Sequence, residues 1–346
     1  MSSRLATAIG GFPLPNPVIC GSGEPVMTEA GIRAALAAGA AGVIAKSVNE
    51  QKAAARQLDR ADYAFVSANA PAERGDSFFC RSGLAQREAR EWFDAIAGID
   101  RDAARSGRFV AASIVLGSAE GAEQLAGFAR MAGLRVFELN VGAPHASEAA
   151  PGAIAQETDP AGLRALVARV RAATGGMQLW VKLTGLSANV PALAAAAAEG
   201  GADAVVMMGR FMAMLPDLDT LAPVLGTSGA YGGGWALPIV CRFLALSRRA
   251  TGSRVPLLGT NGARGGADVA RLALAGASAT EMLSAVMHEG FGALGRAVRE
   301  LDALLAARDL RFEELVGRAA DQLAGYGAQA ERPGRWRAFV PGETLA

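Results

Sequence analysis

Short apolar runs alternate with Ala- and Leu-rich stretches of helical periodicity along most of the chain. The apolar runs do not place a polar residue at every second position, which is typical of parallel strands covered on both faces. Predicted strands occupy residues 16–21, 41–47, 109–117, 136–141, 178–184, 203–209, 255–260 and 279–285. Helical patterns occupy residues 29–38, 120–132, 160–173, 190–199, 236–249, 266–275 and 287–305.

The order of these elements predicts the fold class. Helix starts are well marked, as where Asp159 can cap a helix that has Pro160 at its first position. Eight strand–helix units without a break predict an α/β fold, a (β/α)8 TIM barrel over residues 1–310. A doubly wound open sheet is the alternative.

Two stretches exceed ordinary loop length and interrupt this alternation. Residues 48–108 and 209–236 lie after predicted strands, where a barrel has its enlarged βα loops over the active-site mouth. We expect them to form a rim or lid. Residues 311–346 should add a C-terminal helix over "RFEELVGRAADQLAGYG" and then an irregular tail.

Composition narrows the class of protein. The chain has 346 residues, 51% of them hydrophobic and 19% charged, with a net charge of +1, so no nucleic-acid partner is expected. Its apolar runs are too short to span a bilayer and its start has no signal-peptide pattern, so we expect a cytoplasmic protein. The isolated Cys20, Cys80 and Cys241 predict neither an iron–sulfur site nor a disulfide framework, and only His145 and His288 could serve a His-rich metal site.

Two lysines lie at the ends of predicted strands, where a barrel collects its functional groups. Lys46 in "GVIAKS" and Lys182 in "LWVKLT" would be costly to bury alone, so each needs an anionic or acceptor partner. Pairing with a neighbouring carboxylate for purely structural reasons is the alternative. Ser22, Ser47, Ser113 and Asn140 lie at similar strand ends.

The stretch "GTNGARGGADVARLALAGASATEMLSA" at 259–285 indicates a phosphate site. In barrels, backbone amides of the loops after the seventh and eighth strands bind phosphate, and glycines allow close approach. An ordinary turn is the alternative.

These motifs, in order, resemble the dihydroorotate dehydrogenase family of FMN barrels, including the pyrimidine-reducing domain of dihydropyrimidine dehydrogenase. The resemblance covers roughly residues 7–305, through "NPVICGSG", "GAAGVIAKSV", "FELNVGAPH", "VKLTG" and "LLGTNGARGGADVARLALAGASATEMLSAVMHEG". It implies FMN as cofactor, bound by Gly21, Ser22, Lys46, Ser47, Ser113, Asn140, Lys182, Gly233, Gly259, Asn261, Gly262, Ala263, Leu283 and Ser284. Lys182 would stabilise the negative charge that reduced flavin gains at N1.

The substrate side departs from the family pattern. Ala143 stands where soluble members carry the general-base Cys, and residues 151–159, where the pyrimidine-reducing relatives have theirs, contain none. Gly209 and Cys80 replace two substrate-holding asparagines of the family. His145 is the replacement acid or base that we expect, although it could simply order its loop.

The chain is therefore interpreted as an FMN-dependent oxidoreductase acting on a CH–CH group. Hydride would pass between flavin N5 and a C–C bond of a small, cyclic substrate other than dihydroorotate, contacted by Arg210, Cys80 and Ser82. A homodimer is expected from the family. The alternatives are a flavin-binding barrel with little turnover and a flavin-free phosphate-binding lyase or isomerase.

Overall fold

A closed barrel forms the body of the protein. The computed structural model describes residues 3–67, 75–144, 146 and 152–345. Within them, eight parallel strands close in the order β10-β13-β14-β3-β4-β7-β8-β9, which confirms the predicted TIM barrel against the open sheet. The barrel strands are β3 (Val18–Cys20), β4 (Gly42–Ile44), β7 (Phe109–Val115), β8 (Val136–Asn140), β9 (Gln178–Lys182), β10 (Ala204–Met207), β13 (Leu257–Thr260) and β14 (Ala277–Met282).

The continuous apolar runs are explained by burial on both faces of these strands. All residues of β7 are buried, some inside the barrel and some under the helices. Phe109 and Trp180 meet inside the barrel with ring centroids 5.2 Å apart. A hairpin that the pattern did not predict, β1 (Thr7–Ile9) and β2 (Phe12–Leu14), adds Ile9 and Leu14 to this interior cluster. The hairpin therefore fills the barrel interior at the end where the barrel strands begin.

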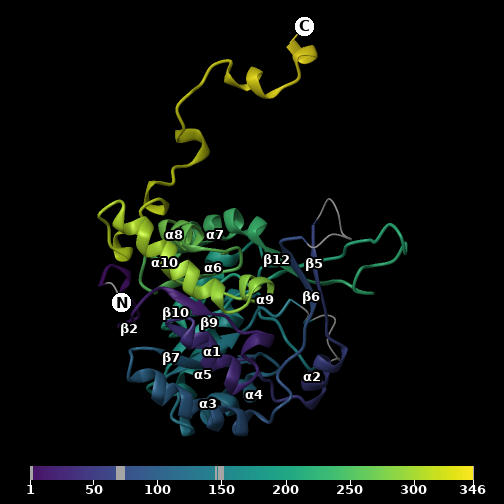
Figure 1. Ribbon diagram of the computed structural model, residues 1–346, viewed down its shortest axis with the longest axis vertical. Coiled ribbons are helices and arrows are strands. Elements are labelled where there is room, and N and C mark those ends of the chain that lie inside the picture. Colours follow the sequence, from purple (N-terminus) through teal and green to yellow (C-terminus); the bar gives the residue numbers. More distant parts are fainter. Residues whose placement is uncertain (1–2, 68–74, 145, 147–151, 346) are drawn as a thin grey trace.

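Helices surround the barrel (Figure 1). They are α1 (Glu29–Ala37), α3 (Ala89–Ala104), α4 (Ala119–Met131), α5 (Pro160–Thr174), α6 (Val190–Glu199), α7 (Leu237–Thr251), α8 (Gly266–Leu274) and α10 (Gly292–Ala306). The predicted cap of α5 is confirmed, because the Asp159 side chain accepts a hydrogen bond from the Gly162 N–H and Pro160 opens the helix.

The insertion expected over residues 48–108 is shorter than predicted. Its second part is α3, an ordinary barrel helix that buries Trp92, Phe93 and Ile96 against the core. Only its first part, which includes α2 (Lys52–Ala55), departs from the strand–helix alternation.

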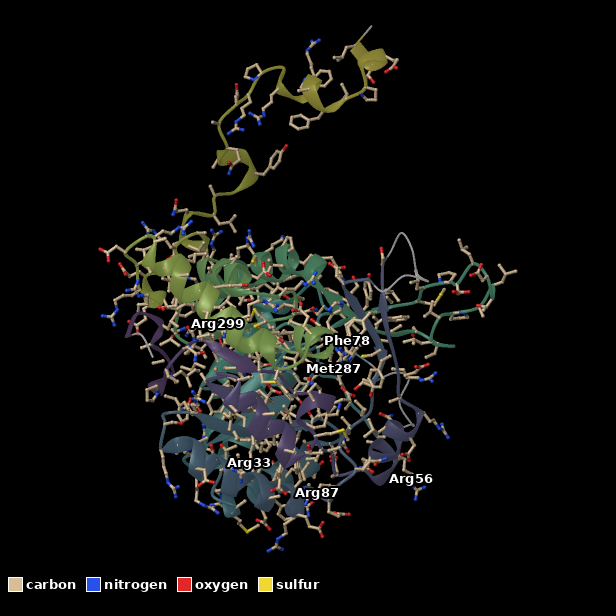
Figure 2. All side chains as sticks on the ribbon, viewed as in Figure 1. Arg33, Arg56, Phe78, Arg87, Met287 and Arg299 are labelled. Atoms are coloured by element: carbon tan, nitrogen blue, oxygen red, sulfur yellow. The ribbon has the colours of Figure 1, made fainter. Side chains whose placement is uncertain are left out.

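A second, smaller sheet covers one side of the barrel mouth. Its strands, β5 (Asp62–Val66), β6 (Ser77–Arg81), β12 (Gly229–Gly233) and β11 (Phe211–Ala213), pair antiparallel in the order β11-β12-β6-β5. We call it the rim sheet. It unites the two predicted insertions, and a short helix, α9 (Ser284–Glu289), packs against it through Met287, which lies close to Phe78 (Figure 2).

The C-terminal part differs from the prediction in two ways. The last barrel strand ends at Met282, and the expected helix 287–305 is two helices, α9 and α10, separated at Gly290 with φ +80°. No α-helix forms over the described residues 311–345. The chain makes short 3₁₀ turns instead, such as Phe312–Leu315 and Ala320–Gln322, because Gly317 with φ +80° breaks the helical path. Beyond Leu323 it extends away from the barrel (Figure 1).

Candidate functional site

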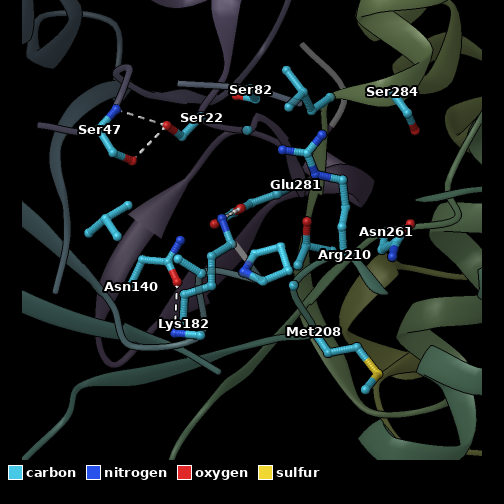
Figure 3. A pocket seen from close by; sticks show the side chains of 18 of the residues that line it. Ser22, Ser47, Ser82, Asn140, Lys182, Met208, Arg210, Asn261, Glu281 and Ser284 are labelled. Carbon is cyan, nitrogen blue, oxygen red and sulfur yellow. Dashed lines mark hydrogen bonds and ion pairs between the residues drawn. The ribbon is translucent and has the colours of Figure 1, made fainter. Parts of the chain in front are cut away.

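One cavity opens at the barrel end where the strands finish (Figure 3). It encloses about 1070 Å³, counting the open space at its mouth. Its walls come from the ends of all eight barrel strands, β7 included through Val115, and from the rim sheet. This is where the (β/α)8 fold collects its functional groups.

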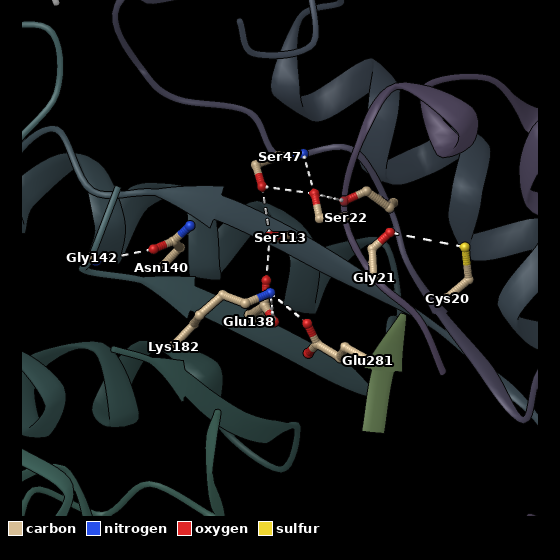
Figure 4. Close-up of polar contacts among 11 residues, drawn as sticks. Cys20, Gly21, Ser22, Ser47, Ser113, Glu138, Asn140, Gly142, Lys182 and Glu281 are labelled. Carbon is tan, nitrogen blue, oxygen red and sulfur yellow. Dashed lines mark hydrogen bonds and ion pairs between the residues drawn. The ribbon is translucent and has the colours of Figure 1, made fainter. Parts of the chain in front are cut away.

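Three ionisable side chains meet at the floor of this cavity. Lys182 Nζ lies 3.2 Å from Glu138 Oε2 and 2.5 Å from Glu281 Oε2 (Figure 4). Both glutamate side chains are fully buried. We call Glu138, Lys182 and Glu281 the Lys182 cluster. One cation here serves two carboxylates.

This imbalance shifts the protonation of the Lys182 cluster. Burial and then the charge of Glu138 raise the pKa of Glu281 to about 8, although Lys182 acts in the opposite direction. Burial lowers the pKa of Lys182, but the two carboxylates outweigh it and the pKa lies above its ordinary value. These shifts favour the charged form of Lys182 and the protonated form of Glu281.

A row of hydroxyl groups leads from the cavity wall to the Lys182 cluster. Ser22 Oγ lies 3.0 Å from Ser47 Oγ, which lies 2.8 Å from Ser113 Oγ. Ser113 donates to Glu138 Oε1 at 2.9 Å (Figure 4). Glu138 thus accepts hydrogen bonds on both of its oxygens, one from Ser113 and one from Lys182.

The second lysine lies near the rim and has a different environment. Glu24 Oε1 accepts hydrogen bonds from Lys46 Nζ at 2.9 Å, Tyr63 Oη at 2.8 Å and Ser82 Oγ at 2.8 Å. We call these residues the Lys46 cluster. Burial raises the pKa of Glu24, but the charge of Lys46 and the hydrogen bonds outweigh it and lower that pKa to about 2. Burial lowers the pKa of Lys46 itself.

Arg210 adds a further cation beside the Lys46 cluster. Its guanidinium lies 5.5 Å from the ring centroid of Phe78 and its Nη1 lies 2.5 Å from Cys80 Sγ. Burial raises the pKa of the Cys80 thiol more than Arg210 lowers it, so the thiol stays protonated. Arg210 lines the cavity whereas Cys80 lies behind it. Such a cation at a cavity wall can hold an anionic group.

The described part of the loop after β8 brings few reactive groups into the cavity. Asn140 lines it and accepts the Gly142 N–H at 3.0 Å. A Cβ at Gly142 would come 2.2 Å from the Thr184 nitrogen, so only glycine fits there. Ala143 presents a methyl group. His145, the expected acid or base, lies outside the described residues, as do Ser147 and Glu148.

The glycine-rich loop after β13 forms the opposite wall. Asn261 Oδ1 accepts a hydrogen bond from the Gly233 N–H at 3.3 Å, while its Nδ2 is buried without a partner among the described residues. Gly262 has φ +97°, and a Cβ there would come 2.7 Å from the Leu237 backbone. Glycine at position 262 therefore lets the loop pack against the start of α7, and Asn261 still has a donor to offer.

The structure brings most of the sequence-predicted site residues together. The predicted residues that line the cavity are Gly21, Ser22, Lys46, Ser47, Ser82, Asn140, Lys182, Arg210, Asn261, Gly262, Ala263, Leu283 and Ser284. The predicted residues that do not line it are Ser113, Gly233, Gly259 and Cys80. Ser113 and Gly233 lie one hydrogen bond behind lining residues, at Ser47 and Asn261.

Sequence reasoning missed the carboxylates. Glu24, Glu138 and Glu281 were not among the expected site residues, although a partner for each lysine was expected. The signal was present, because Glu138 in "VFELNV" and Glu281 in "ATEMLSA" interrupt apolar strands just as the lysines do.

The part of the chain that the structure describes contains neither a metal-binding group nor a membrane-spanning helix. The described ranges hold no group of three or more His, Cys, Asp or Glu side chains placed to bind a metal ion. Within the same ranges, no helix is both long enough and apolar enough to cross a membrane.

Comparison with known proteins agrees with this geometry. The family model "Dihydroorotate dehydrogenase" matches residues 93–305. Over 319 residues the chain is 28% identical to the catalytic subunit of dihydroorotate dehydrogenase B (NAD(+)) of Methanocella arvoryzae, covering 91% of this chain and 98% of that protein. It is 30% identical over 162 residues to dihydroorotate dehydrogenase A (fumarate) of Limosilactobacillus reuteri, covering 47% of this chain. That match spans about half the relative's length, 51%.

The chain belongs to the dihydroorotate dehydrogenase family, because the family model matches more than half of it. Members of this family are FMN-binding flavoproteins. The cavity fits such a cofactor. The buried Asn261 Nδ2 and Glu281 Oε1 on its walls have no hydrogen-bond partner within the described ranges, so both are left for a ligand.

Proposed function

We propose that this member of the dihydroorotate dehydrogenase family binds FMN in the barrel cavity and catalyses an oxidation–reduction at a C–C bond of a small, cyclic substrate other than dihydroorotate. The observation that carries the proposal is the convergence of the strand-end polar residues on one cavity. FMN would supply the hydride acceptor or donor at its N5.

The protein residues would share the work of holding FMN. Asn261, Gly262 and Ala263, with Leu283 and Ser284 opposite them, would bind the phosphate end. The flavin ring would lie against Gly21, Ser22, Lys46, Ser47, Asn140 and Lys182, which line the rest of the cavity. Asn261 Nδ2 is the sharpest single contact, because it is a buried donor without a protein partner in the described chain.

The substrate proposal rests on what replaces the family's acid–base group. Ala143 has no group that could take a proton from the substrate carbon next to the one that exchanges hydride. We therefore propose a substrate other than dihydroorotate, with His145 as the group that takes or returns that proton. Arg210 would hold an anionic substituent of the substrate.

The cofactor half of the proposal is tested by purifying the full chain, recording its visible spectrum and identifying any released cofactor by mass. We expect a yellow protein that releases FMN. A colourless protein that also takes up no added FMN would overturn the proposal and favour the flavin-free phosphate-binding barrel.

The phosphate contact is tested with Asn261→Asp. Asp tolerates the positive φ of +75° at this position and keeps the acceptor for the Gly233 N–H, but it replaces the free donor with a negative charge. We expect FMN affinity to fall at least about tenfold, since a hydrogen bond to a charged group is worth roughly 1.5–3 kcal/mol. Asn189→Asp, which changes a residue outside the cavity, should leave FMN affinity unchanged.

The substrate half is tested by photoreducing the FMN-loaded protein without oxygen and adding unsaturated cyclic compounds one at a time. Reoxidation by an anionic compound, lost in Arg210→Ala, is the expected result. Rapid reoxidation by orotate would contradict the substrate proposal. If FMN binds but no compound in a broad panel reoxidises it, the methyl group of Ala143 in place of an acid or base favours a flavin-binding barrel with little turnover.

A further inference from the structure

Glu281 is a buried carboxyl group for which the proposed function has no role. It lies on β14, and its Oε2 is 2.5 Å from Lys182 Nζ. Its Oε1 is buried, has no partner within the described ranges, and belongs to a residue that lines the cavity. A buried oxygen without a partner is costly in a protein interior, so this atom calls for a ligand.

The charges around Glu281 cannot all be balanced with both carboxylates ionised. The titratable groups that face it in the described chain are Glu138 from β8, Lys182 from β9 and the Cys20 thiol from β3. Burial, then the charge of Glu281, raises the pKa of Cys20 to about 12, so the thiol is neutral. Two carboxylates against one ammonium would leave a net negative charge in a desolvated site, which strongly favours retention of one proton.

The hydrogen bonds indicate which carboxyl group keeps that proton. Glu138 accepts from Ser113 on Oε1 and from Lys182 on Oε2, so both of its oxygens are satisfied as those of a carboxylate. In the described chain Glu281 accepts a hydrogen bond from Lys182 on Oε2, and its carboxyl group also lies within hydrogen-bonding reach of Glu138. Its Oε1 has no hydrogen bond within the described ranges, so it is the oxygen that can carry hydrogen, and Glu281 is among the residues that line the cavity (Figure 3).

We propose that Glu281 holds a proton on Oε1 at neutral pH, donates it in a hydrogen bond to the cofactor in the cavity, and thereby couples proton binding by the protein to reduction of that cofactor. The inference rests on the proposed function for the identity of the cofactor. The proton on Glu281 follows from the protein's own contacts and is tested without FMN.

The coupling follows from charge balance. Bound FMN would take up two electrons and one proton on reduction by a hydride; the negative charge gained beside the Lys182 cluster would make loss of the Glu281 proton less favourable. Where oxidised protein has lost that proton and reduced protein keeps it, each reduction takes up one extra proton from solvent. The reduction equilibrium then changes by a further tenfold per pH unit, about 30 mV for a two-electron couple, on top of the change due to the cofactor's own proton.

The proton is tested first on the FMN-free protein by infrared difference spectroscopy across a pH series. We expect the C=O stretch of a protonated carboxylic acid at neutral pH, which disappears as the pH rises through about 8. The band should be absent from Glu281→Gln. It should remain in the matched control Glu50→Gln, which removes a partly buried carboxyl group outside this cavity. Absence of the band from the wild-type protein, or its persistence in Glu281→Gln, would overturn the proposal.

The coupling is tested on the FMN-loaded protein by measuring the reduction potential of FMN against pH. Wild type and Glu50→Gln should show the additional slope of one proton per two electrons above neutral pH, and Glu281→Gln should lack it while still binding FMN. Equal slopes in all three proteins would overturn the coupling. Failure of the wild-type protein to take up FMN would overturn both the coupling and the proposed function, and the infrared band would still decide the state of Glu281.

Discussion

The Lys46 cluster and the Lys182 cluster contain the same kinds of groups in opposite proportions. At Glu24, three donors converge on one carboxylate, and its pKa falls to about 2. At Lys182, one cation is shared between two carboxylates, and the pKa of Glu281 rises. Burial acts in the same direction on both glutamates, so the ratio of donors to carboxylates decides the outcome.

The difference separates two roles within one cavity. The Lys46 cluster is a fixed ion pair that ties β5 and β6 of the rim sheet to the barrel through Tyr63 and Ser82. The Lys182 cluster has an acid with an oxygen left over. An ionised carboxylate that accepts three hydrogen bonds is suited to holding structure, whereas a retained proton is suited to chemistry.

We expect the largest loss in the free energy of unfolding when either lysine is replaced. Lys182→Met leaves Glu138 with only Ser113 and next to Glu281, so we expect a loss of about 3–5 kcal/mol, as for a broken buried ion pair. Lys46→Met leaves Glu24 with the Tyr63 and Ser82 hydrogen bonds and should cost about 1–3 kcal/mol. The free energy of unfolding in urea measures both. Equal losses would contradict the claim that Glu24 is better supplied with hydrogen-bond donors than Glu138 and Glu281.

The next largest effect is on how the free energy of unfolding depends on pH, which should differ between the two clusters. The folded-state pKa of Glu24 is depressed from 4.5 to about 2, so its contribution to stability is present above pH 4.5 and is lost as the pH falls toward 2. The lost contribution is roughly 3 kcal/mol. In Glu24→Gln the free energy of unfolding should therefore change less with pH between 4.5 and 2, the acid limb of the plot of stability against pH.

Glu281 should act in the opposite sense on the same profile. Its folded-state pKa is raised from 4.5 to about 8, so its contribution is present below pH 4.5 and is lost as the pH rises through 8. Glu281→Gln should flatten the stability profile between those values and leave the acid limb unchanged. Urea unfolding of wild type and both variants across pH 3–9 provides the measurement; identical profiles for the two variants would contradict the comparison.

The smallest effect should come from removing one hydroxyl donor at each cluster. Ser113→Ala removes the only donor to Glu138 Oε1 in the described chain and should cost about 1–2 kcal/mol. Ser82→Ala leaves Glu24 Oε1 with Lys46 and Tyr63, so we expect a loss below about 1 kcal/mol. Thermal or urea unfolding distinguishes them, and a larger loss in Ser82→Ala would reverse the assignment of the better-satisfied carboxylate.

Local sequence patterns predicted the barrel because burial on two faces leaves a local signature. All eight predicted strands overlap barrel strands, as where residues 109–117 contain β7 (Phe109–Val115). The rim sheet has no such signature. Its strands β6 and β12 lie far apart in the sequence and are defined by pairs such as Cys80 with Ala230, which only the folded barrel brings together.

The sequence allowed us to predict the lysines of the site but not the carboxylates that pair with them. Lys46 and Lys182 were recognised because a buried charge needs a partner, but which of the chain's 33 acidic residues supplies it depends on the closure of the barrel. Glu281 meets Lys182 across 99 positions of sequence. The expected helix within residues 311–346 failed for a local reason, the glycine with positive φ at Gly317.

The rim sheet has a consequence for how such an enzyme can be diversified. One half of it comes from the segment between β4 and α3, the other from the segment between β10 and α7, and neither half has its inner hydrogen-bonding partner without the other. The two segments therefore have to be exchanged together between related proteins, because each supplies the pairing strand of the other. A transplant of substrate preference between relatives should move both segments together and can leave the eight barrel strands untouched.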